Sequence, residues 1–346
     1  MVSPALLPTT TLSPEDDAAL GELYRRGTPQ NTLRAWERDL AYISAWKAAR
    51  FAAKPVWPEE EQVALRFVLD HSADLTDRPG AAQAAALDLI ALGLRRSLAC
   101  PAPATLDRRI ASWRAFHRMR NLASPFTAPL VAAARQKARR ANARPPAPKS
   151  ARPLTRDVLE ELLATCDDSL RGLRDRAILM LGFGSGGRRR SEITALYRDD
   201  IGTEDFAAKG LLWIRLLTTK TTSRAEAPRL PLKGRAARAV MGWIIEAGIE
   251  TGPLFRPISR SGRALDRALA PDAIRVILRH RLGLAGHPAD YATPHGLRAG
   301  FLTQAALDGA PLAAAMKLSL HRSAIQAQKY YADVEITDNP ATDLLG

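Results

Sequence analysis

The chain has 346 residues, and its 46% hydrophobic content excludes an intrinsically disordered polypeptide and allows two folded domains. Its 50 lysines and arginines outnumber 36 acidic residues, and the resulting net charge of +14 favours a polyanionic partner such as nucleic acid. No apolar run is long enough to span a membrane, and residues 1–11 lack the pattern of a signal peptide, so we expect no membrane partner and a cytoplasmic location. The two cysteines, Cys100 and Cys166, indicate reduced thiols rather than a disulfide framework or a zinc site.

The first part of the chain predicts a small all-helical domain. Residues 1–27 are rich in Pro, Thr and Asp and predict a mobile leader. Residues 28–138 contain apolar side chains at helical spacing, in segments separated by Pro, Gly or Asp, and Thr28 or Asn31 can cap the first of them. The helices expected in this domain cover about residues 28–47, 58–69, 80–98 and 104–120.

A basic, proline-rich stretch over residues 139–153 predicts a linker. Seven basic residues and no acidic ones lie between positions 135 and 152, and the prolines before Lys149 favour an extended connector. These charges either solvate the linker or contact a DNA backbone that it crosses, and the sequence leaves both interpretations open. The candidate DNA-binding residues of this stretch are Arg139, Arg140, Arg144, Lys149 and Arg152.

The region over residues 154–335 predicts a mainly helical domain with one small β-sheet. Thr155 can cap its first helix, helical patterns continue to about residue 183, and another covers 190–197. Residues 211–217 and 227–232 predict two strands joined by a turn, and helical patterns resume from position 234. A short tail, residues 336–346, completes the chain.

Gly182, Gly184 and Gly187 match the G-x-G-x-x-G pattern of dinucleotide sites, with Glu204 at a suitable distance downstream. However, the spacing before these glycines is that of a helix rather than a strand, and an arginine triplet follows them. We therefore reject a nucleotide site and expect a turn in which the backbone approaches another segment.

Several polar residues indicate a reaction when taken together, although each alone has an ordinary explanation as a surface charge or a core side chain. An arginine triplet precedes a helix that carries Glu192, where one guanidinium could bind phosphate. An H-x-x-R sequence, His295 to Arg298, opens a later helix, and His321 precedes a late pair of tyrosines. Lys220 lies in the predicted hairpin.

In this order, the residues resemble the motifs of tyrosine recombinases of the phage integrase superfamily, which include the Cre/Xer-like site-specific recombinases. The family's first box, Gly-x-Arg-x-Ser-Glu, is similar to the segment from Gly187 to Glu192. The resemblance places the supporting acid on Glu192 and the six catalytic positions on Arg189, Lys220, His295, Arg298, His321 and Tyr330. Three positions depart from the family pattern: Arg188 replaces a common Leu, Leu320 replaces a common Gly, and Tyr331 offers a second tyrosine beside the nucleophile.

The resemblance implies a mainly α, two-domain clamp: an all-helical, SAM-like core-binding domain at 28–138 and a mostly helical catalytic domain with a small antiparallel sheet at 154–335. It implies a 3′-phosphotyrosyl intermediate and strand exchange through a Holliday junction, by a nucleoid-associated homotetramer on two double-stranded DNA sites. The tail at 336–346 would dock on a neighbouring protomer. No cofactor or metal is expected, because the sequence lacks a metal-ligand pattern and two arginines can neutralise the phosphate.

The resemblance also suggests roles for the site residues. Arg189 and Arg298 would bind the non-bridging phosphate oxygens, His295 would be the base for Tyr330, and Lys220 the acid for the leaving oxygen. Two alternatives remain: a DNA-binding protein that has lost its chemistry, and a type IB topoisomerase, which uses a similar set of residues.

Overall fold

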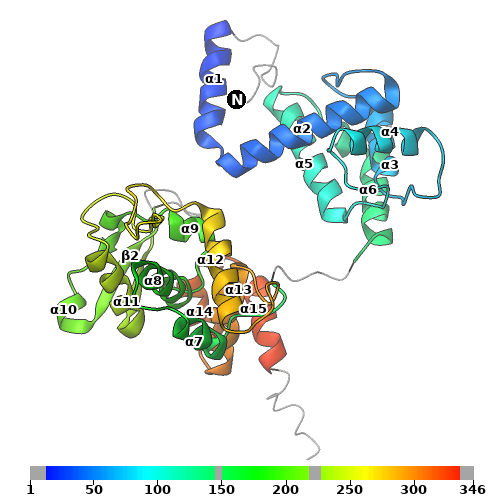
Figure 1. Ribbon diagram of the computed structural model, residues 1–346. Coiled ribbons are helices and arrows are strands. Elements are labelled where there is room, and N and C mark those ends of the chain that lie inside the picture. Colours follow the sequence, from blue (N-terminus) through cyan, green and yellow to red (C-terminus); the bar gives the residue numbers. More distant parts are fainter. Residues whose placement is uncertain (1–12, 145–149, 218–226, 336–346) are drawn as a thin grey trace, which may run out of the picture. The chain divides into compact units, whose positions relative to one another are not determined.

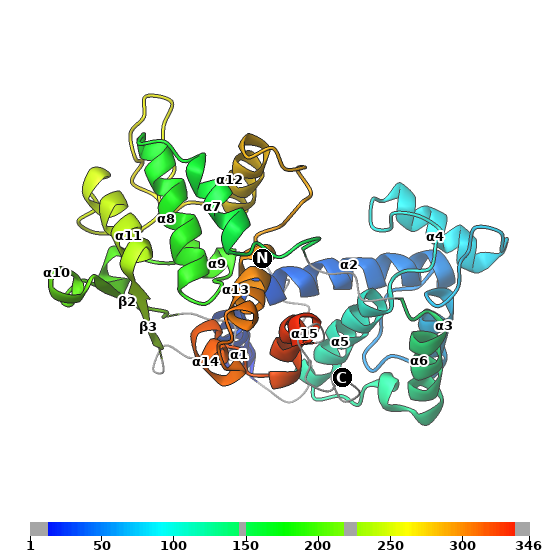
Figure 2. The same cartoon turned by 90° about the horizontal axis from the view of Figure 1, so that it is seen from below.

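The computed structural model describes residues 13–144, 150–217 and 227–335 (Figures 1 and 2). The chain forms two compact units, residues 1–146 and 147–346, which are taken separately below. In the part of the chain that is described, no helix is both long and apolar enough to cross a membrane.

The N-terminal unit is built from helices joined by loops. Its helices are α1 (Pro14–Gly27), α2 (Gln30–Phe51), α3 (Glu61–Asp70), α4 (Ala81–Ala91), α5 (Pro103–Met119) and α6 (Pro129–Ala141), with a 3-10 turn at Pro125–Thr127. The four helices that we expected are present, although α4 is shorter than predicted and ends at Ala91, before a turn at Gly93.

Aromatic side chains from α2, α3 and α5 form the core of this unit. The Trp46 ring centroid lies 4.9 Å from that of Phe67, which lies 5.3 Å from that of Trp113, both pairs packing edge to face. Buried beside them, the His71 ring bonds the Tyr42 hydroxyl and the Phe67 carbonyl oxygen, each at 2.7 Å. Burial lowers the pKa of His71 to about 3, so this histidine is neutral in the folded unit.

Three local predictions for this unit were wrong. Residues 14–27 of the expected leader form α1, because the Ser13 hydroxyl caps it by accepting the Asp16 amide at 3.0 Å and Pro14 favours a first helical position. Helix α2 begins after Pro29 without a side-chain cap, so neither Thr28 nor Asn31 caps it. The predicted linker starts too early: Arg139 and Arg140 lie in the last turn of α6.

The second unit is mainly helical with one three-stranded antiparallel sheet of order β1-β2-β3, as its sequence indicates. Its strands are β1 (Ile201–Gly202), β2 (Leu211–Arg215) and β3 (Arg229–Lys233). Its helices are α7 (Arg156–Ala164), α8 (Leu170–Gly184), α9 (Arg190–Thr194), the 3-10 turn η3 (Arg198–Asp200), α10 (Phe206–Lys209), α11 (Gly234–Glu246), α12 (Pro271–Leu284), α13 (His295–Leu307), α14 (Leu312–Ser319) and α15 (Ala324–Glu335).

The sheet packs its apolar face into the core of the second unit. Leu212 of β2 pairs with Leu232 of β3, and both are buried with Trp243 of α11. The two predicted strands are confirmed, whereas β1 was missed because two residues carry no periodic signal. The predicted turn between β2 and β3, which includes Lys220, lies outside the described residues.

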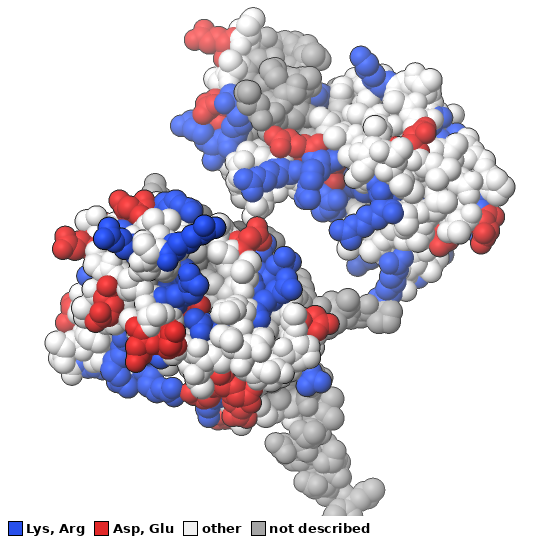
Figure 3. Space-filling model, viewed as in Figure 1, with Lys and Arg blue, Asp and Glu red and all other residues white. Residues whose placement is uncertain are grey.

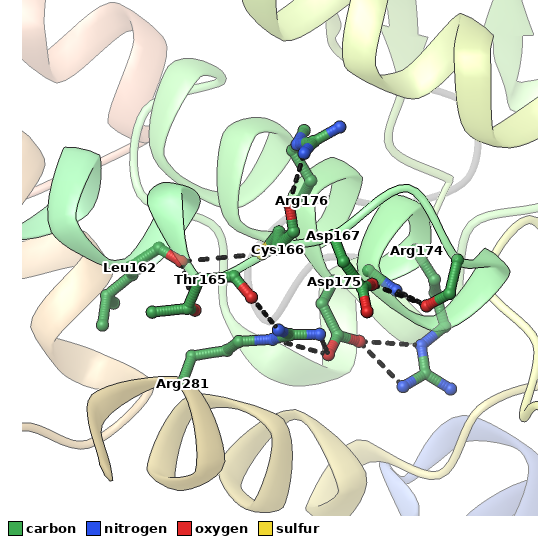
Figure 4. Close-up of polar contacts among 10 residues, drawn as sticks. Leu162, Thr165, Cys166, Asp167, Arg174, Asp175, Arg176 and Arg281 are labelled. Atoms are coloured by element: carbon green, nitrogen blue, oxygen red, sulfur yellow. Dashed lines mark hydrogen bonds and ion pairs between the residues drawn. The ribbon is translucent and has the colours of Figure 1, made fainter. Parts of the chain in front are cut away.

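A hydrogen-bonded network of one carboxylate and two guanidiniums fastens α8 to α12 (Figure 4). Both carboxylate oxygens of buried Asp175 accept hydrogen bonds: Oδ1 from Arg174 at 2.7 Å and Oδ2 from Arg281 at 2.8 Å. Arg281 also donates to the Thr165 carbonyl oxygen at 2.6 Å, so the segment after α7 joins the network. These contacts satisfy one buried carboxylate with two guanidiniums and the backbone.

The glycine pattern at 182–187 follows a helix, not a strand, which confirms that it is not a dinucleotide motif. Gly186 and Gly187 have φ angles of +100° and +72°, which side chains rarely adopt. A Cβ on Gly186 would lie 2.4 Å from the Leu318 carbonyl, and one on Gly187 would lie 2.4 Å from Arg298 Cα. This turn therefore brings the arginine triplet against α13 and the end of α14.

Candidate active site

Side chains from four segments of the second unit converge near this glycine turn. Arg189 directly precedes α9, His295 and Arg298 lie in the first turns of α13, and His321 follows α14. Tyr330 lies in α15, which packs against α13. The structure thus brings together five of the six predicted catalytic residues, while Lys220 lies outside the described residues.

Glu192 fixes the position of Arg189. One oxygen of its carboxylate accepts the Arg189 backbone amide at 3.1 Å, and the other accepts Nη1 of the same arginine at 2.5 Å. The Glu192 side chain is 4% exposed, whereas that of Arg189 is 36% exposed. Buried Glu192 therefore fixes the guanidinium of Arg189, which solvent or a ligand can still reach.

Arg298 is almost completely buried beside the glycine turn. Its Nη1 donates to the Gly187 carbonyl oxygen at 3.1 Å, and its Nε donates to His321 Nε2 at 3.2 Å. Burial, together with the positive charges of Arg189 and Arg188, lowers its pKa to about 10. The guanidinium still carries its charge at neutral pH and is held rigidly by backbone and imidazole.

His321 is neutral at neutral pH, because burial and the neighbouring arginines lower its pKa to about 4. Its Nδ1 lies 2.8 Å from the Ser319 hydroxyl. Arg298 faces both ring nitrogens, with Nε 3.2 Å from Nε2 and Nη2 3.2 Å from Nδ1, and because a guanidinium only donates, the neutral imidazole accepts from it at one nitrogen.

The turn before His321 keeps a left-handed backbone although Leu320 stands where the family often has glycine. Leu320 has φ 54° and ψ 40° and ends α14. Its side chain packs against the main hydrophobic core of the unit, and this contact offsets part of the cost of a conformation that side chains disfavour.

The two adjacent tyrosines of α15 have different surroundings. The Tyr330 hydroxyl lies 3.1 Å from His295 Nε2, and its ring centroid is 6.4 Å from that of His321. Tyr331 is 4% exposed and donates its hydroxyl to the Ala310 carbonyl oxygen at 3.0 Å. Tyr330 therefore faces the converging polar groups, and Tyr331 is a core residue.

An open groove of about 290 Å³ lies at Arg189, His295 and Arg298, and arginine dominates its lining. It is lined by Arg188, Arg189, Arg190, Arg275, Thr293, Pro294, His295 and Arg298. In Figure 3, basic side chains gather around α9 and α12 on this unit. Arg275 of α12 was missed by the sequence analysis, because no motif distinguishes it from Arg279, which is also exposed on this helix.

This arrangement can bind one phosphodiester and activate a phenol. Two guanidiniums with fixed positions can donate to the non-bridging oxygens, and their charge stabilises the additional negative charge of a five-coordinate phosphorus. His295 can accept the Tyr330 proton through the 3.1 Å contact. Among residues 13–144, 150–217 and 227–335, no three His, Cys, Asp or Glu side chains group as metal ligands would.

The predicted DNA-binding residues of the linker region are divided between the two units. Arg139 and Arg140 are exposed at the end of α6, and Lys149 lies outside the described residues. Arg144 donates to the Cys100 carbonyl oxygen at 2.6 Å. Arg152 is exposed in the second unit, with its Cζ 5.3 Å from the Tyr291 ring centroid.

Arg144 instead belongs to a second basic cavity, of about 730 Å³, in the N-terminal unit. Its arginines come from α2, the loop between α4 and α5, α5, and the segment after α6: Arg38, Arg95, Arg96, Arg108, Arg109 and Arg144. Asp39, the acidic residue of this lining, is buried and already accepts bonds from Arg108 and Ser112. Figure 3 shows basic side chains over α2 and α5. The cavity therefore presents an excess of positive charge suited to phosphate.

Comparisons with known proteins agree with this geometry. The phage integrase family matches residues 152–335. A tyrosine recombinase XerC of Rhodospirillum centenum is 32% identical over 320 residues, which cover 89% of this chain and 79% of that protein. An integrase/recombinase xerD homolog of Selenomonas ruminantium is 31% identical over 170 residues, which are 47% of this chain and 48% of that protein.

Solved structures share the fold at low sequence identity. The Tn1549 transposon integrase, in complex with a circular intermediate DNA, superposes with a TM-score of 0.56 at 14% identity, covering 93% of this chain and 98% of that one. A lambda integrase dimer bound to a core site gives 0.53 at 15% identity, covering 93% and 95%. Sequence match, fold and relatives agree, and the chain belongs to the phage integrase family of tyrosine recombinases.

Proposed function

We propose that this protein is a site-specific recombinase that cuts and rejoins double-stranded DNA through a covalent bond between phosphate and Tyr330. The Tyr330 oxygen attacks the scissile phosphorus, and the phenol proton passes to His295. The phosphorus–O5′ bond breaks, leaving a 3′-phosphotyrosyl linkage, and the 5′-oxygen takes a proton from Lys220. Rejoining reverses these steps with a second 5′-hydroxyl, so the bond energy is conserved.

One observation carries this proposal: the Tyr330 hydroxyl lies 3.1 Å from His295 Nε2, beside an arginine-lined groove that includes Arg189 and Arg298. The nucleophile, its base and the phosphate-binding cations are thus within reach of one phosphodiester. His321 supports Arg298, and Glu192 supports Arg189.

Both units contribute basic surfaces to the proposed DNA complex. The cavity around Arg109 in the N-terminal unit and the groove around Arg189 in the second unit each suit backbone phosphates. By analogy with the family, a homotetramer would join two sites through a Holliday junction, with the tail at 336–346 docked on a neighbour and the linker at 139–153 crossing the DNA. Such a protein would act at the nucleoid, in the cytoplasm.

Trapping the covalent intermediate tests the proposal. Footprinting on DNA that flanks the gene first identifies a bound site, and a nicked duplex of that site then prevents rejoining. We expect the wild-type protein to form a denaturation-resistant adduct, and Tyr330→Phe to bind the duplex without forming one. Tyr331→Phe is the matched control, because that hydroxyl bonds the Ala310 carbonyl, and it should keep forming the adduct.

Two outcomes would contradict the proposal. Binding to the site without an adduct from the wild-type protein would identify a DNA-binding protein without the chemistry. Relaxation of a supercoiled plasmid that lacks the site, at the same rate as one that contains it, would identify a topoisomerase.

A further inference from the structure

Arg188, which replaces the leucine common in the family, joins two segments of the site. It follows the glycine turn, and its side chain is 1% exposed. Its Nη2 donates to the Leu318 carbonyl oxygen at 2.6 Å and to that of Gly186 at 3.3 Å. Leu318 lies three residues before His321, so the side chain links the segment that carries Arg189 to the turn that carries His321.

The remaining nitrogens of this guanidinium are not satisfied in the free protein. Nε and Nη1 of Arg188 have no hydrogen-bond partner among the described residues, although both are buried. Nη1 lies 3.7 Å from Glu192 Oε2, a distance too long for a hydrogen bond, and that oxygen already accepts the Arg189 amide. A buried arginine with so few partners is costly, since buried charges are normally paired and hydrogen-bonded.

The site therefore holds more positive charge than its own carboxylate can balance. The guanidiniums of Arg188, Arg189 and Arg298 line one groove, and Glu192 lies beside the first two, so these four groups carry a charge of +2 (3 − 1). Burial lowers the pKa of Arg188 to about 10, so it stays protonated at neutral pH. A bound phosphodiester supplies one negative charge, and its five-coordinate transition state supplies two.

We propose that Arg188 is a positioning residue of the cleavage site. Its bond to the Leu318 carbonyl holds the His321 turn against Arg298, and its buried charge lies behind the scissile phosphate. This charge is balanced only as the transition state forms, so it accelerates the chemical step more than it strengthens DNA binding. The inference rests on the function proposed above.

Two substitutions separate the charge of Arg188 from its bulk. Arg188→Met keeps an unbranched apolar stem and removes the charge, whereas Arg188→Lys keeps the charge. Single-turnover adduct formation on the nicked site is measured together with the Kd for DNA and the melting temperature. If the methionine variant does not fold, Arg188→Gln replaces it, because its amide is neutral and can still donate.

We expect the neutral variant to form the adduct about tenfold more slowly, less than the ~10²–10³ typical of a donor that touches the reacting group. Its Kd should change less than about threefold, because the charge acts on the transition state more than on bound DNA. Arg188→Lys should keep a rate close to that of the wild type. If a folded neutral variant cleaves at the wild-type rate, Arg188 only fills space and the inference is wrong. A wild-type protein without an adduct would instead refute the proposed function.

Discussion

Two groups of buried arginines in the second unit differ in how completely they are hydrogen-bonded. Around Asp175, both guanidiniums donate to one carboxylate, and Arg281 also bonds the backbone (Figure 4). Around Glu192, Arg189 donates to the carboxylate, while two nitrogens of Arg188 have no hydrogen-bond partner among the described residues. The first group is complete without a ligand and stabilises the fold. The second is completed by an anion, which is what a phosphate-binding site requires.

The largest expected effect comes from breaking the hydrogen-bonded group around Asp175. Asp175→Ala leaves two buried guanidiniums without their carboxylate and should lower the free energy of unfolding by about 3–5 kcal/mol. Urea unfolding measures this loss. The matched control is Asp272→Ala, because that carboxylate is 84% exposed and pairs with Arg190 at the surface, where a pair contributes at most about 1 kcal/mol. Equal losses in the two variants would contradict the assigned role of the network.

Removing a cation from the site around Glu192 should affect chemistry more than folding. Arg298→Ala should slow adduct formation by a factor of about 10²–10³, because the non-bridging oxygens lose a preorganised donor. Its melting temperature should fall less than that of Asp175→Ala, because the partners of Arg298 are the Gly187 carbonyl and neutral His321, and its removal leaves no buried charge without a partner. Single-turnover assays on the nicked site check the rate. A variant that unfolds like Asp175→Ala would place Arg298 in the structural group instead.

The N-terminal unit offers a third case, a buried group that stays uncharged. The pKa of His71 is about 3 in the folded unit and about 6.5 when unfolded, so below pH 6.5 the unfolded chain binds the additional proton. Its contribution to stability is complete above pH 6.5 and is lost as the pH falls toward 3. The loss has an upper limit of about 1.4 kcal/mol per pH unit. The free energy of unfolding, measured with urea between pH 7 and 5, should therefore fall with decreasing pH by a smaller slope in His71→Gln than in the wild type. An unchanged slope would contradict this assignment.

The smallest expected effect concerns the left-handed turn before His321. Leu320→Gly removes the strain of φ 54° but also a packed side chain, so the free energy of unfolding should change by less than about 1 kcal/mol. Leu320→Val is the control, because a β-branched side chain disfavours this conformation further and should lower stability. Thermal unfolding of both variants checks the order. A more stable valine variant would show that packing, not backbone strain, dominates at this position.

The sequence predicted most of the helices and the two paired strands, because their apolar side chains recur with regular spacing over many residues. It missed α6 and β1: Pro129–Ala141 presents Val131 as its single buried residue, and Ile201–Gly202 is too short to show a period. It also predicted a mobile leader over Pro14–Gly27. This segment is a helix capped by Ser13, but its composition is as polar as that of a mobile segment.

The site was harder to predict where it depends on the direction in which a helical residue faces rather than on a sequence motif. Tyr330 and Tyr331 are chemically identical neighbours, and a helix turns about 100° between them, so only the fold separates the residue facing His295 from the one bonding Ala310. The same holds for Arg275, which reaches the groove from α12 without a motif of its own. The unpartnered nitrogens of Arg188 could be found only from its burial.

The most direct test of the central claim is to identify the residue that carries the DNA. The adduct formed on the nicked site is digested with nuclease and protease, and the modified peptide is sequenced by mass spectrometry. We expect a phosphate-linked nucleotide on Tyr330, the tyrosine that lies 3.1 Å from His295. A nucleotide on Tyr331, or on any other residue, would contradict the account.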